Sequence, residues 1–553
     1  MKADQIIKNA KIFTSNKDSL LASALVVKDG KFVYVGDEAG LSDYEGEVTD
    51  LEGKFIMPGI IDSHSHAPIC VCFEYVDLGV WITCEGKQEA LDFMAEHIRN
   101  NPGLERYRFL MERAILKGEE LTKEDLDAIC PDSELMVLEG EAHSIWLNSK
   151  ILALHGITDD TPDPVPGLSC YVRKDGHITG NAYEYVIWPF IFDHLAKTLT
   201  DEQIEKAIDS WIDYCKRSGE IGFFDAGFPE NDELHERIYA YLRDMDRQGR
   251  LPVYIDGCYM LTNRNKLKEA LEETKRFNRE FNTEHLKVHT LKIYMDGSLK
   301  LKTAGLVTPY EGTDDIGPTA FNGEEVAEIL KELNEAGLDL HVHTVGERAS
   351  RVVLDGVELA RKELGDNYHV KVTCSHLEIQ DKADLPRFAE LGVFANYTPL
   401  WHTGYTEDDL SVLLGEERAD NMYLSKSVWD TGAIVTWSSD DVVFYNDFEV
   451  WNPYLGMEVG MTRWSNEKTK SPDFCRTKVP CPPVSEQMSV EEMILGYTIN
   501  GALQLGIEAS KGSIEAGKDA DFLVFDKDLL TAEHEGFSYN MPQNVYFCGK
   551  KVK

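Results

Sequence analysis

The sequence lacks a long apolar run and an apolar leader, and it has far fewer basic than acidic residues. No stretch of the 553 residues approaches the 18 apolar residues that a transmembrane helix needs. The first residues, MKADQIIKNAKIFTSN, show no basic segment followed by an apolar core, so no signal peptide is expected. Lys and Arg number 56 against 97 Asp and Glu, a formal net charge of −41. Such a chain repels phosphate backbones and anionic lipids, which disfavours nucleic acid and membranes as partners.

The cysteines do not form a disulfide framework. There are 11 of them, an odd number, and Cys70 and Cys72 are too close in the chain for an easy bridge. We therefore expect a reducing, cytoplasmic location. Hydrophobic residues make up 43% of the chain, which is ordinary for a globular protein and excludes disorder as the default.

Both ends of the chain are β-like, and the middle alternates strands with helices. Residues 1–56 and 506–553 contain short β runs separated by glycine turns, which predicts one β-sandwich built from the two ends. Within 57–505, apolar strands such as GLDLHVHTVG repeatedly precede amphipathic helices such as ASRVVLDGVELARKELG, a pattern typical of a parallel sheet. The number of units favours a closed (β/α)8 TIM barrel. The irregular sequence at about 70–190 is predicted to be an insertion over the barrel mouth.

Histidines and acids stand at the ends of several predicted barrel strands. PGIIDSHSH ends a strand with His64 and His66, whose side chains point the same way and can bind one metal ion. Later strand ends offer further ligands in chain order: His341 and His343, His376, and Asp440 and Asp441. Imidazole and carboxylate together suit Zn²⁺ or another divalent transition ion with positions open for water. Such an ion activates water, and a nearby carboxylate can accept the proton.

Several longer segments, some of which include these strand ends, resemble the sequences of a known family. They are EAHSIWLNSKIL at 141–152, LKIYMDGSLKLKTAGL at 291–306, HTVGERA at 343–349 and YTINGALQLGIEASKGSIEAGKDADFLVFD at 497–526. With PGIIDSHSH they resemble the amidohydrolase superfamily, in its YtcJ-like or amidohydrolase-3 branch, which includes N-substituted formamide deformylases. The resemblance covers nearly the whole chain. It implies a metal-dependent hydrolase with a distorted (β/α)8 barrel and a β-sandwich formed from both termini.

The resemblance also implies roles for individual residues. Its metal ligands fall on His64, His66, His343, His376 and Asp440, and Asp440 is also the catalytic carboxylate. His341 stays a competitor of His343, because both lie on the same side of one strand.

Lys292 falls where related binuclear hydrolases carry a carboxylated lysine that bridges two metals. That reaction requires a neutral amine and hence a depressed pKa. The alternative is a charged lysine paired with Asp296. One or two zinc ions are therefore expected, depending on whether Lys292 is carboxylated.

The remaining predicted site residues belong to the pocket. His143 matches a pocket histidine of the family that hydrogen-bonds the developing oxyanion, or else it bonds to the adjacent loop backbone. The predicted substrate-binding residues are Trp81, Trp146, Trp401 and Arg173.

Three functions follow from these residues. The first is hydrolysis of an amide or N-formyl carbon–nitrogen bond in a small molecule. The second is hydrolysis of a cyclic amide or an ester, or deamination of a ring, on the same fold. The third is metal binding without catalysis, which the retention of Asp440 argues against. The resemblance also leads us to expect a homodimer.

Overall fold

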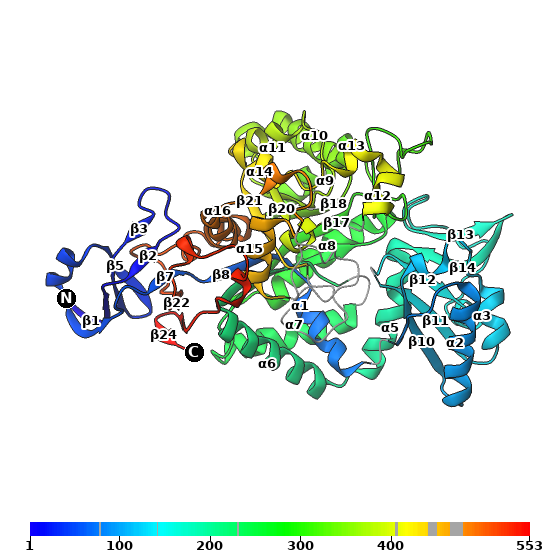
Figure 1. The fold of residues 1–553 in the computed structure, drawn as a ribbon, viewed down its shortest axis with the longest axis horizontal. Coiled ribbons are helices and arrows are strands. Elements are labelled where there is room, and N and C mark those ends of the chain that lie inside the picture. The colour runs from blue at the N-terminus through cyan, green and yellow to red at the C-terminus, as the bar shows by residue number, and fades with distance from the viewer. Residues whose placement is uncertain (77–78, 141, 229–231, 404–406, 441–450, 465–478) are drawn as a thin grey trace.

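The computed structural model describes all of the 553 residues except 77–78, 141, 229–231, 404–406, 441–450 and 465–478. Figure 1 shows three regions along its horizontal axis: a β region holding both chain ends, a central barrel, and a separate α/β region. Among the helices formed by the described residues, none is both long and apolar enough to cross a membrane.

Eight parallel strands form the central barrel, in the order β21-β20-β19-β18-β17-β16-β15-β8. Their bounds are Ile60–Ser65 (β8), Glu220–Asp225 (β15), Tyr254–Leu261 (β16), Leu286–Tyr294 (β17), Asp339–Thr344 (β18), Val372–His376 (β19), Phe394–Tyr397 (β20) and Val435–Trp437 (β21). Between the first and last strands, the Asp440 N–H donates to the His64 carbonyl at 2.9 Å and nearly closes the ring. The predicted distorted (β/α)8 barrel is confirmed.

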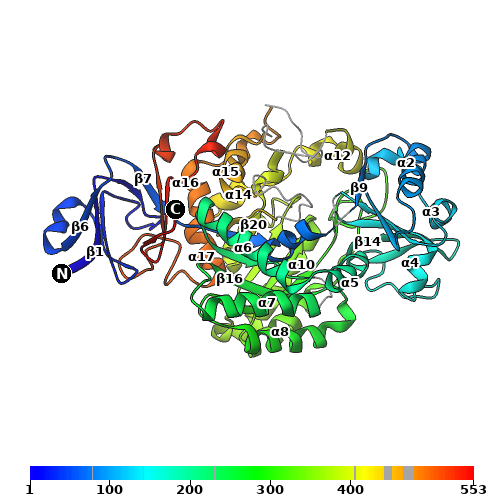
Figure 2. The same cartoon turned by 90° about the horizontal axis from the view of Figure 1, so that it is seen from below.

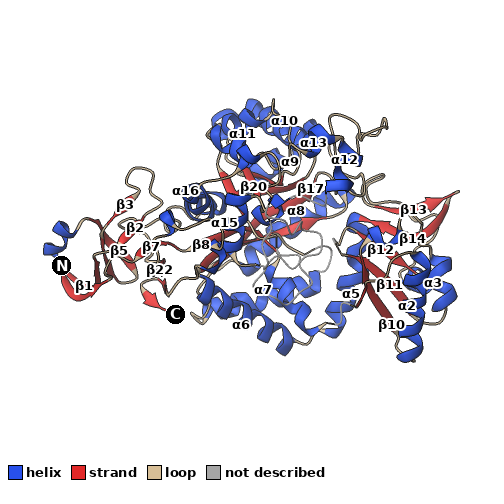
Figure 3. Ribbon diagram, in the orientation of Figure 1, coloured by secondary structure: helices blue, strands red, loops and turns tan. Residues whose placement is uncertain are grey.

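The barrel strands are buried because they are covered on both faces. Every residue of β8 and β15 is buried, as expected for parallel strands with a helical outer layer. Figures 2 and 3 show the helices around the central strands. The barrel helices with their neighbours are α1 (Ala67–Cys70), α5 (Trp188–Thr198), α6 (Asp201–Ser218), α7 (Asp232–Arg247), α8 (Leu267–Phe281), α9 (Gly323–Ala336), α10 (Glu347–Leu364), α11 (Leu385–Leu391), α12 (Glu407–Leu414), α13 (Glu416–Ala419), α14 (Ser425–Asp430), α15 (Pro453–Thr462), α16 (Val490–Leu495) and α17 (Gly501–Leu505).

The helix that follows the His343 strand illustrates why these segments fold as they do. In α10, Val353, Leu354, Val357 and Ala360 recur at helical spacing and are all buried. Arg361 and Lys362 occupy the last turn, where positive charge favours the helix dipole. The apolar face of α10 therefore packs on the barrel and its polar face meets solvent.

Both chain ends contribute strands to one six-stranded sheet, in the order β24-β23-β22-β7-β2-β3. A second sheet has the order β5-β4-β1-β6. The bounds are Lys2–Lys8 (β1), Lys11–Phe13 (β2), Leu21–Ala22 (β3), Ala24–Lys28 (β4), Lys31–Gly36 (β5), Glu45–Asp50 (β6), Phe55–Pro58 (β7), Phe522–Phe525 (β22), Asn544–Phe547 (β23) and Lys550–Lys551 (β24). One buried cluster joins Ile12, Phe32 and Ile56 to Phe522 and Val524. The terminal β-sandwich is thus confirmed, and its boundaries at 56 and 505 stay a prediction.

The segment between the first two barrel strands contains a regular α/β unit. Its six strands have the order β13-β14-β12-β11-β10-β9. The bounds are Val80–Ile82 (β9), Arg106–Met111 (β10), Glu134–Glu139 (β11), Ser144–Leu147 (β12), Cys170–Lys174 (β13) and His177–Tyr183 (β14), with helices Lys87–Asn100 (α2), Lys123–Ile129 (α3) and Ser149–Leu154 (α4). The predicted insertion at about 70–190 therefore contains regular strands and helices, and its bounds and its place over the barrel mouth stay a prediction. The strands are short and separated by polar connections, so they gave little periodic signal.

Candidate metal centre

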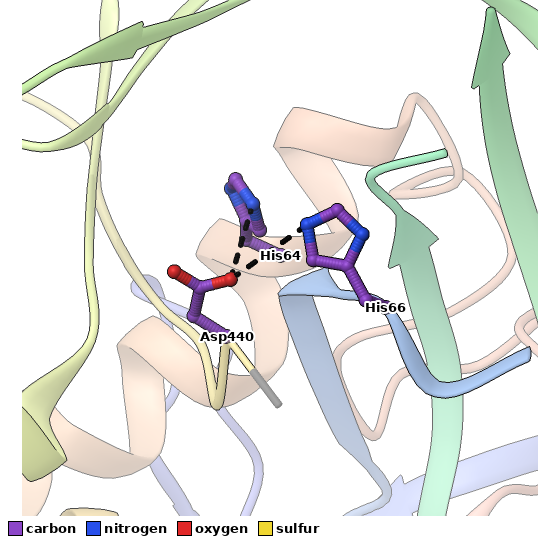
Figure 4. Close-up of side chains that lie close together, drawn as sticks. All are labelled: His64, His66 and Asp440. Atoms are coloured by element: carbon purple, nitrogen blue, oxygen red, sulfur yellow. Dashed lines mark ion pairs between the residues drawn. The ribbon is translucent and has the colours of Figure 1, made fainter. Parts of the chain in front are cut away.

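Two imidazoles and one carboxylate meet where β8 and β21 end. The Asp440 Oδ1 lies 3.5 Å from His64 Nε2 and 3.8 Å from His66 Nε2. Figure 4 shows the three side chains pointing toward one another. Their ligand atoms all lie within 4.8 Å of each other, so they could hold one metal ion.

His376 and His343 complete a buried cluster around this group. The His376 Nδ1 lies 3.3 Å from Asp440 Oδ2, and the rings of His376 and His343 have centroids 4.3 Å apart. The buried side-chain atoms without a hydrogen-bond partner include three in this cluster: His343 Nε2, His376 Nδ1 and Asp440 Oδ1. Buried polar atoms normally have partners. Unpartnered nitrogen and oxygen atoms gathered in one place therefore fit a shared divalent cation.

The charge states also suit a metal ligand set. Burial lowers the pKa of His64, His66, His343 and His376 well below the ordinary value of histidine. Neutral imidazole is the form that coordinates metal. Burial raises the pKa of Asp440 to about 6, so this carboxylate is ionised at neutral pH.

The backbone is unusual at two of these positions. His376 has a φ of +78° and Asp440 a φ of +42°, in the left-handed region that side-chain-bearing residues seldom adopt. His376 ends β19 and Asp440 lies three positions after the end of β21, so the chain turns at the carboxyl ends of both strands. Such strain persists where the surrounding structure holds it, and it clusters at functional sites.

His341 contacts the Nδ1 of His64, whereas the Nε2 of His64 faces Asp440 and Lys292. Its Nε2 is 2.9 Å from His64 Nδ1, and its ring stacks on Phe224 with centroids 4.2 Å apart. If His64 binds a metal through Nε2, its Nδ1–H donates to His341. His343 is the strand-β18 histidine that faces His376, which favours it over His341 as a proposed ligand.

Lys292 points into the same cluster. Its Nζ lies 3.1 Å from His64 Nε2 and 3.5 Å from His66 Nε2. Burial lowers the pKa of Lys292 to about 8, which makes the neutral amine accessible for carboxylation. The alternative partner, Asp296, instead accepts N–H bonds from Gly305, Val345 and Gly346. The bridging role of Lys292 stays a proposal.

His143 is held by a side chain that the sequence did not point to. Its Nδ1 is 2.6 Å from Glu184 Oε2, and its ring centroid lies 6.3 Å from that of His343. The expected alternative was a bond to the adjacent loop backbone, whereas the partner comes from 41 positions along the chain. No motif links the two residues, so only the fold reveals the pair.

The four predicted substrate-binding residues lie in different surroundings. Trp401 stacks on His376 with centroids 5.4 Å apart, beside the cluster. Trp81 is half-buried in β9, and Trp146 lies in the insertion core with the Arg113 guanidinium 4.6 Å above its ring. Arg173 of β13 donates to Asp163 at 2.8 Å and to the Thr161 carbonyl, both in the segment before that strand. Of these four residues, Trp401 contacts the cluster, and Arg173 forms its hydrogen bonds within the insertion. Asp441 lies outside the described residues.

Comparison with known proteins shows the family of proteins to which this chain belongs. A model of the amidohydrolase family matches residues 47–552, so the chain belongs to that family. N-substituted formamide deformylase of Arthrobacter pascens is 25% identical over 541 residues, 95% of this chain and 94% of that protein. Exoenzymes regulatory protein AepA of Pectobacterium carotovorum subsp. carotovorum is 24% identical over 449 residues, 78% of this chain and 93% of that protein.

A solved structure shows the same fold. The structure of an uncharacterized metal-dependent hydrolase from Pyrococcus horikoshii has a TM-score of 0.65 at 21% identity and covers 96% of this chain and 99% of that one. The family resemblance drawn from the sequence is confirmed, and the protein is a hydrolase of the amidohydrolase family.

Proposed function

We propose that the protein hydrolyses an amide or N-formyl carbon–nitrogen bond in a small molecule, with a divalent metal as cofactor. The observation that carries this is the buried cluster of unpartnered imidazole and carboxylate atoms at the carboxyl ends of the barrel strands, where barrel enzymes place their chemistry. The proposed metal-holding residues are His64, His66, His343, His376, Asp440 and Lys292. One zinc ion is expected, or two if Lys292 is carboxylated.

A metal bound there would supply Lewis acidity toward the substrate carbonyl and a water that ionises near neutral pH. Asp440 accepts the proton of the attacking water and returns it to the leaving nitrogen. Its pKa of about 6 suits both roles, because the group is ionised at pH 7 yet readily protonated. The His143 N–H donates to the carbonyl oxygen as negative charge develops on it.

The surroundings of the cluster favour a substrate with an apolar group. Trp401 lies beside His376 in a parallel stack and offers one flat apolar wall. Trp81 is proposed to shape the pocket from the insertion, and Trp146 to support the insertion from its core. Arg173 is proposed to bind a substrate carboxylate only if its bond to Asp163 is given up.

The 25% identity to N-substituted formamide deformylase across most of both chains supports the N-formyl amide class over cyclic amides, esters and aminated rings. A substrate panel tests this choice. Zinc-loaded enzyme is assayed with N-formyl amines, linear amides, cyclic amides, esters and aminated heterocycles, and with the metal removed by a chelator as control. We expect metal-dependent release of amine from an N-formyl or linear amide. Turnover confined to another class would move the assignment to that class, and no turnover with tight metal binding would favour a non-catalytic role.

We also propose a homodimer and a cytoplasmic location, with no nucleic-acid or membrane partner. The acidic composition, with a net charge of −41, and the family resemblance support these proposals. Light scattering on the purified protein measures the assembly directly, and a monomeric mass would refute the dimer.

A further inference from the structure

We propose that Gln504 is a positioning residue for the metal centre: its side chain joins the two end strands of the barrel sheet and so sets how far His64 stands from Asp440. This role rests on the proposed function, in which His64 and Asp440 hold a metal. The juxtaposition that carries it is one amide between two strands. The Gln504 Nε2 lies 2.8 Å from the Ser63 carbonyl oxygen of β8, and its Oε1 lies 2.6 Å from the Thr436 hydroxyl oxygen of β21.

The line between β8 and β21, which we call the seam, is where the barrel closes. These strands stand at the two ends of the eight-stranded sheet. Neighbouring strands elsewhere in the sheet are joined by ladders of backbone hydrogen bonds, which fix their separation. The metal centre lies on the seam, because His64 belongs to β8, His66 directly follows it, and Asp440 comes after β21 (Figure 4). The separation of β8 and β21 is therefore also the separation of these proposed ligands.

The hydrogen bonds around Gln504 fix the orientation of its amide. Asn396 of β20 donates through Nδ2 to the Thr436 hydroxyl at 3.0 Å. That hydroxyl has a single proton, which it donates to the Gln504 Oε1. The Gln504 Nε2 is thereby directed at the Ser63 carbonyl. All four residues are at most 6% exposed, and breaking a buried hydrogen bond is costly because it leaves a polar group without a partner.

The segment that carries Gln504 packs closely against both strands. A Cβ added at Gly501, which begins α17, would lie 2.9 Å from the Ile61 side chain on β8. A Cβ added at Gly496, in the turn before α17, would lie 2.1 Å from the Trp437 side chain on β21. Only glycine allows such close approach at either position. The segment is thus held against the seam from both sides, and Gln504 reaches from it to both strands.

The residues that Gln504 joins are close in the chain to the metal centre. Ser63 directly precedes His64, and Thr436 lies four positions before Asp440. Nearer the barrel mouth the Asp440 N–H donates to the His64 carbonyl at 2.9 Å, so the seam is crossed a second time. Metal sites tolerate about 0.2 Å of variation in their ligand distances. A small movement of β21 relative to β8 would therefore weaken metal binding.

Gln504→Met removes both hydrogen bonds and keeps a side chain of similar length. We expect the affinity of the apo protein for zinc, measured by competition with a chelator, to fall about 10–100-fold. Gln487→Met is the matched control, because the Gln487 Nε2 also donates to a backbone carbonyl, that of Thr462 at 2.9 Å, away from the seam. The control should bind zinc as the wild type does. A Gln504→Met variant with lower thermal stability but wild-type zinc affinity would show a merely structural role and overturn the inference.

Thr436 supplies an independent pair of variants on the other side of the bond. Thr436→Val removes the hydroxyl and keeps the shape, whereas Thr436→Ser keeps the hydroxyl. We expect Thr436→Val to weaken zinc binding about 10–100-fold and Thr436→Ser to bind zinc near the wild-type affinity. Thr274→Val is the control, since Thr274 is equally buried but donates to the Ala270 carbonyl within α8. An equal loss in Thr436→Val and Thr436→Ser would assign the effect to packing and contradict the proposal.

The double variant tests whether the two residues form one link. Gln504→Met and Thr436→Val remove the same connection between the strands, so their combination should bind zinc about as tightly as the weaker single variant. Residues in one hydrogen-bond network are not additive in this way, whereas independent ones are. Losses of zinc affinity that multiply would show that Gln504 and Thr436 act separately, which overturns the proposed link.

A spectrum reports the geometry of the site without any turnover. The protein is loaded to saturation with Co²⁺ in place of zinc, and its visible absorption follows the arrangement of the ligands around the ion. We expect the bands of Gln504→Met to differ from those of the wild type, and those of Gln487→Met to match them. Identical spectra in all three would overturn the inference. If the wild type binds zinc but hydrolyses no amide, and Gln504→Met weakens that binding, the proposed function fails while the role of Gln504 stands. A wild type that binds no zinc would overturn both.

Discussion

The substitution Asp440→Asn tests the acid–base role most sharply. Asn has the size of Asp but cannot accept a proton from water at neutral pH. The side chain is 5% exposed and lies within 3.3–3.8 Å of nitrogens of His64, His66 and His376, so little room exists for water to replace it. General acid–base catalysis contributes about 10²–10⁴-fold, or about 2.7–5.4 kcal/mol at about 1.36 kcal/mol for each tenfold. We expect kcat to fall by that factor.

The assay is steady-state hydrolysis of the best substrate, with metal content measured on the same samples. Metal should remain bound at saturating zinc, because the histidines are unchanged. Asp246→Asn is the matched control, since Asp246 is also a buried carboxylate hydrogen-bonded to a histidine, His285, but on helix α7. A metal-loaded Asp440→Asn variant with wild-type kcat would refute the assigned base.

Three further predictions follow from the same geometry. Zinc affinity of the apo protein should rise from pH 6 to pH 8.5, by up to about tenfold per pH unit for each proton released. The reason is that Asp440, with a pKa of about 6, gains its negative charge, and Lys292, with a pKa of about 8, loses its positive charge. Competition with a chelator measures this affinity, and an affinity that is flat or falls with pH would contradict the prediction. His341→Phe removes the 2.9 Å contact behind His64 and should weaken zinc binding about 10–100-fold; unchanged affinity would show that His341 does not support His64. Arg173→Met should leave KM unchanged, since the guanidinium is bonded to Asp163; a raised KM for carboxylate-bearing substrates only would show that Arg173 binds substrate after all.

The sequence was most informative where the chain is most regular. The barrel strands were visible because most contain an apolar run and several precede an amphipathic helix. His64 and His66 were identifiable because a two-residue spacing on a strand places both side chains on one face. The same rule could not separate His341 from His343, which also differ by two. Only the barrel packing, which seats His341 against Phe224 and His343 against His376, distinguishes them.

The insertion was the part that the sequence concealed. Its strands are short, so their alternation was not visible among the polar connections. Trp146 was expected in the pocket because it is near His143 in the sequence, yet its ring lies in the insertion core. Glu184 gave no signal, because its role depends on a contact made 41 residues away.

The central claim is that residues from separate barrel strands hold a catalytic metal. Crystals of zinc-loaded protein, measured with anomalous scattering above and below the zinc edge, test it directly. We expect one or two anomalous peaks within coordination distance of His64, His66 and Asp440, with added density on Lys292 if two ions are present. Zinc found only elsewhere, or none at this cluster in fully active crystals, would contradict it.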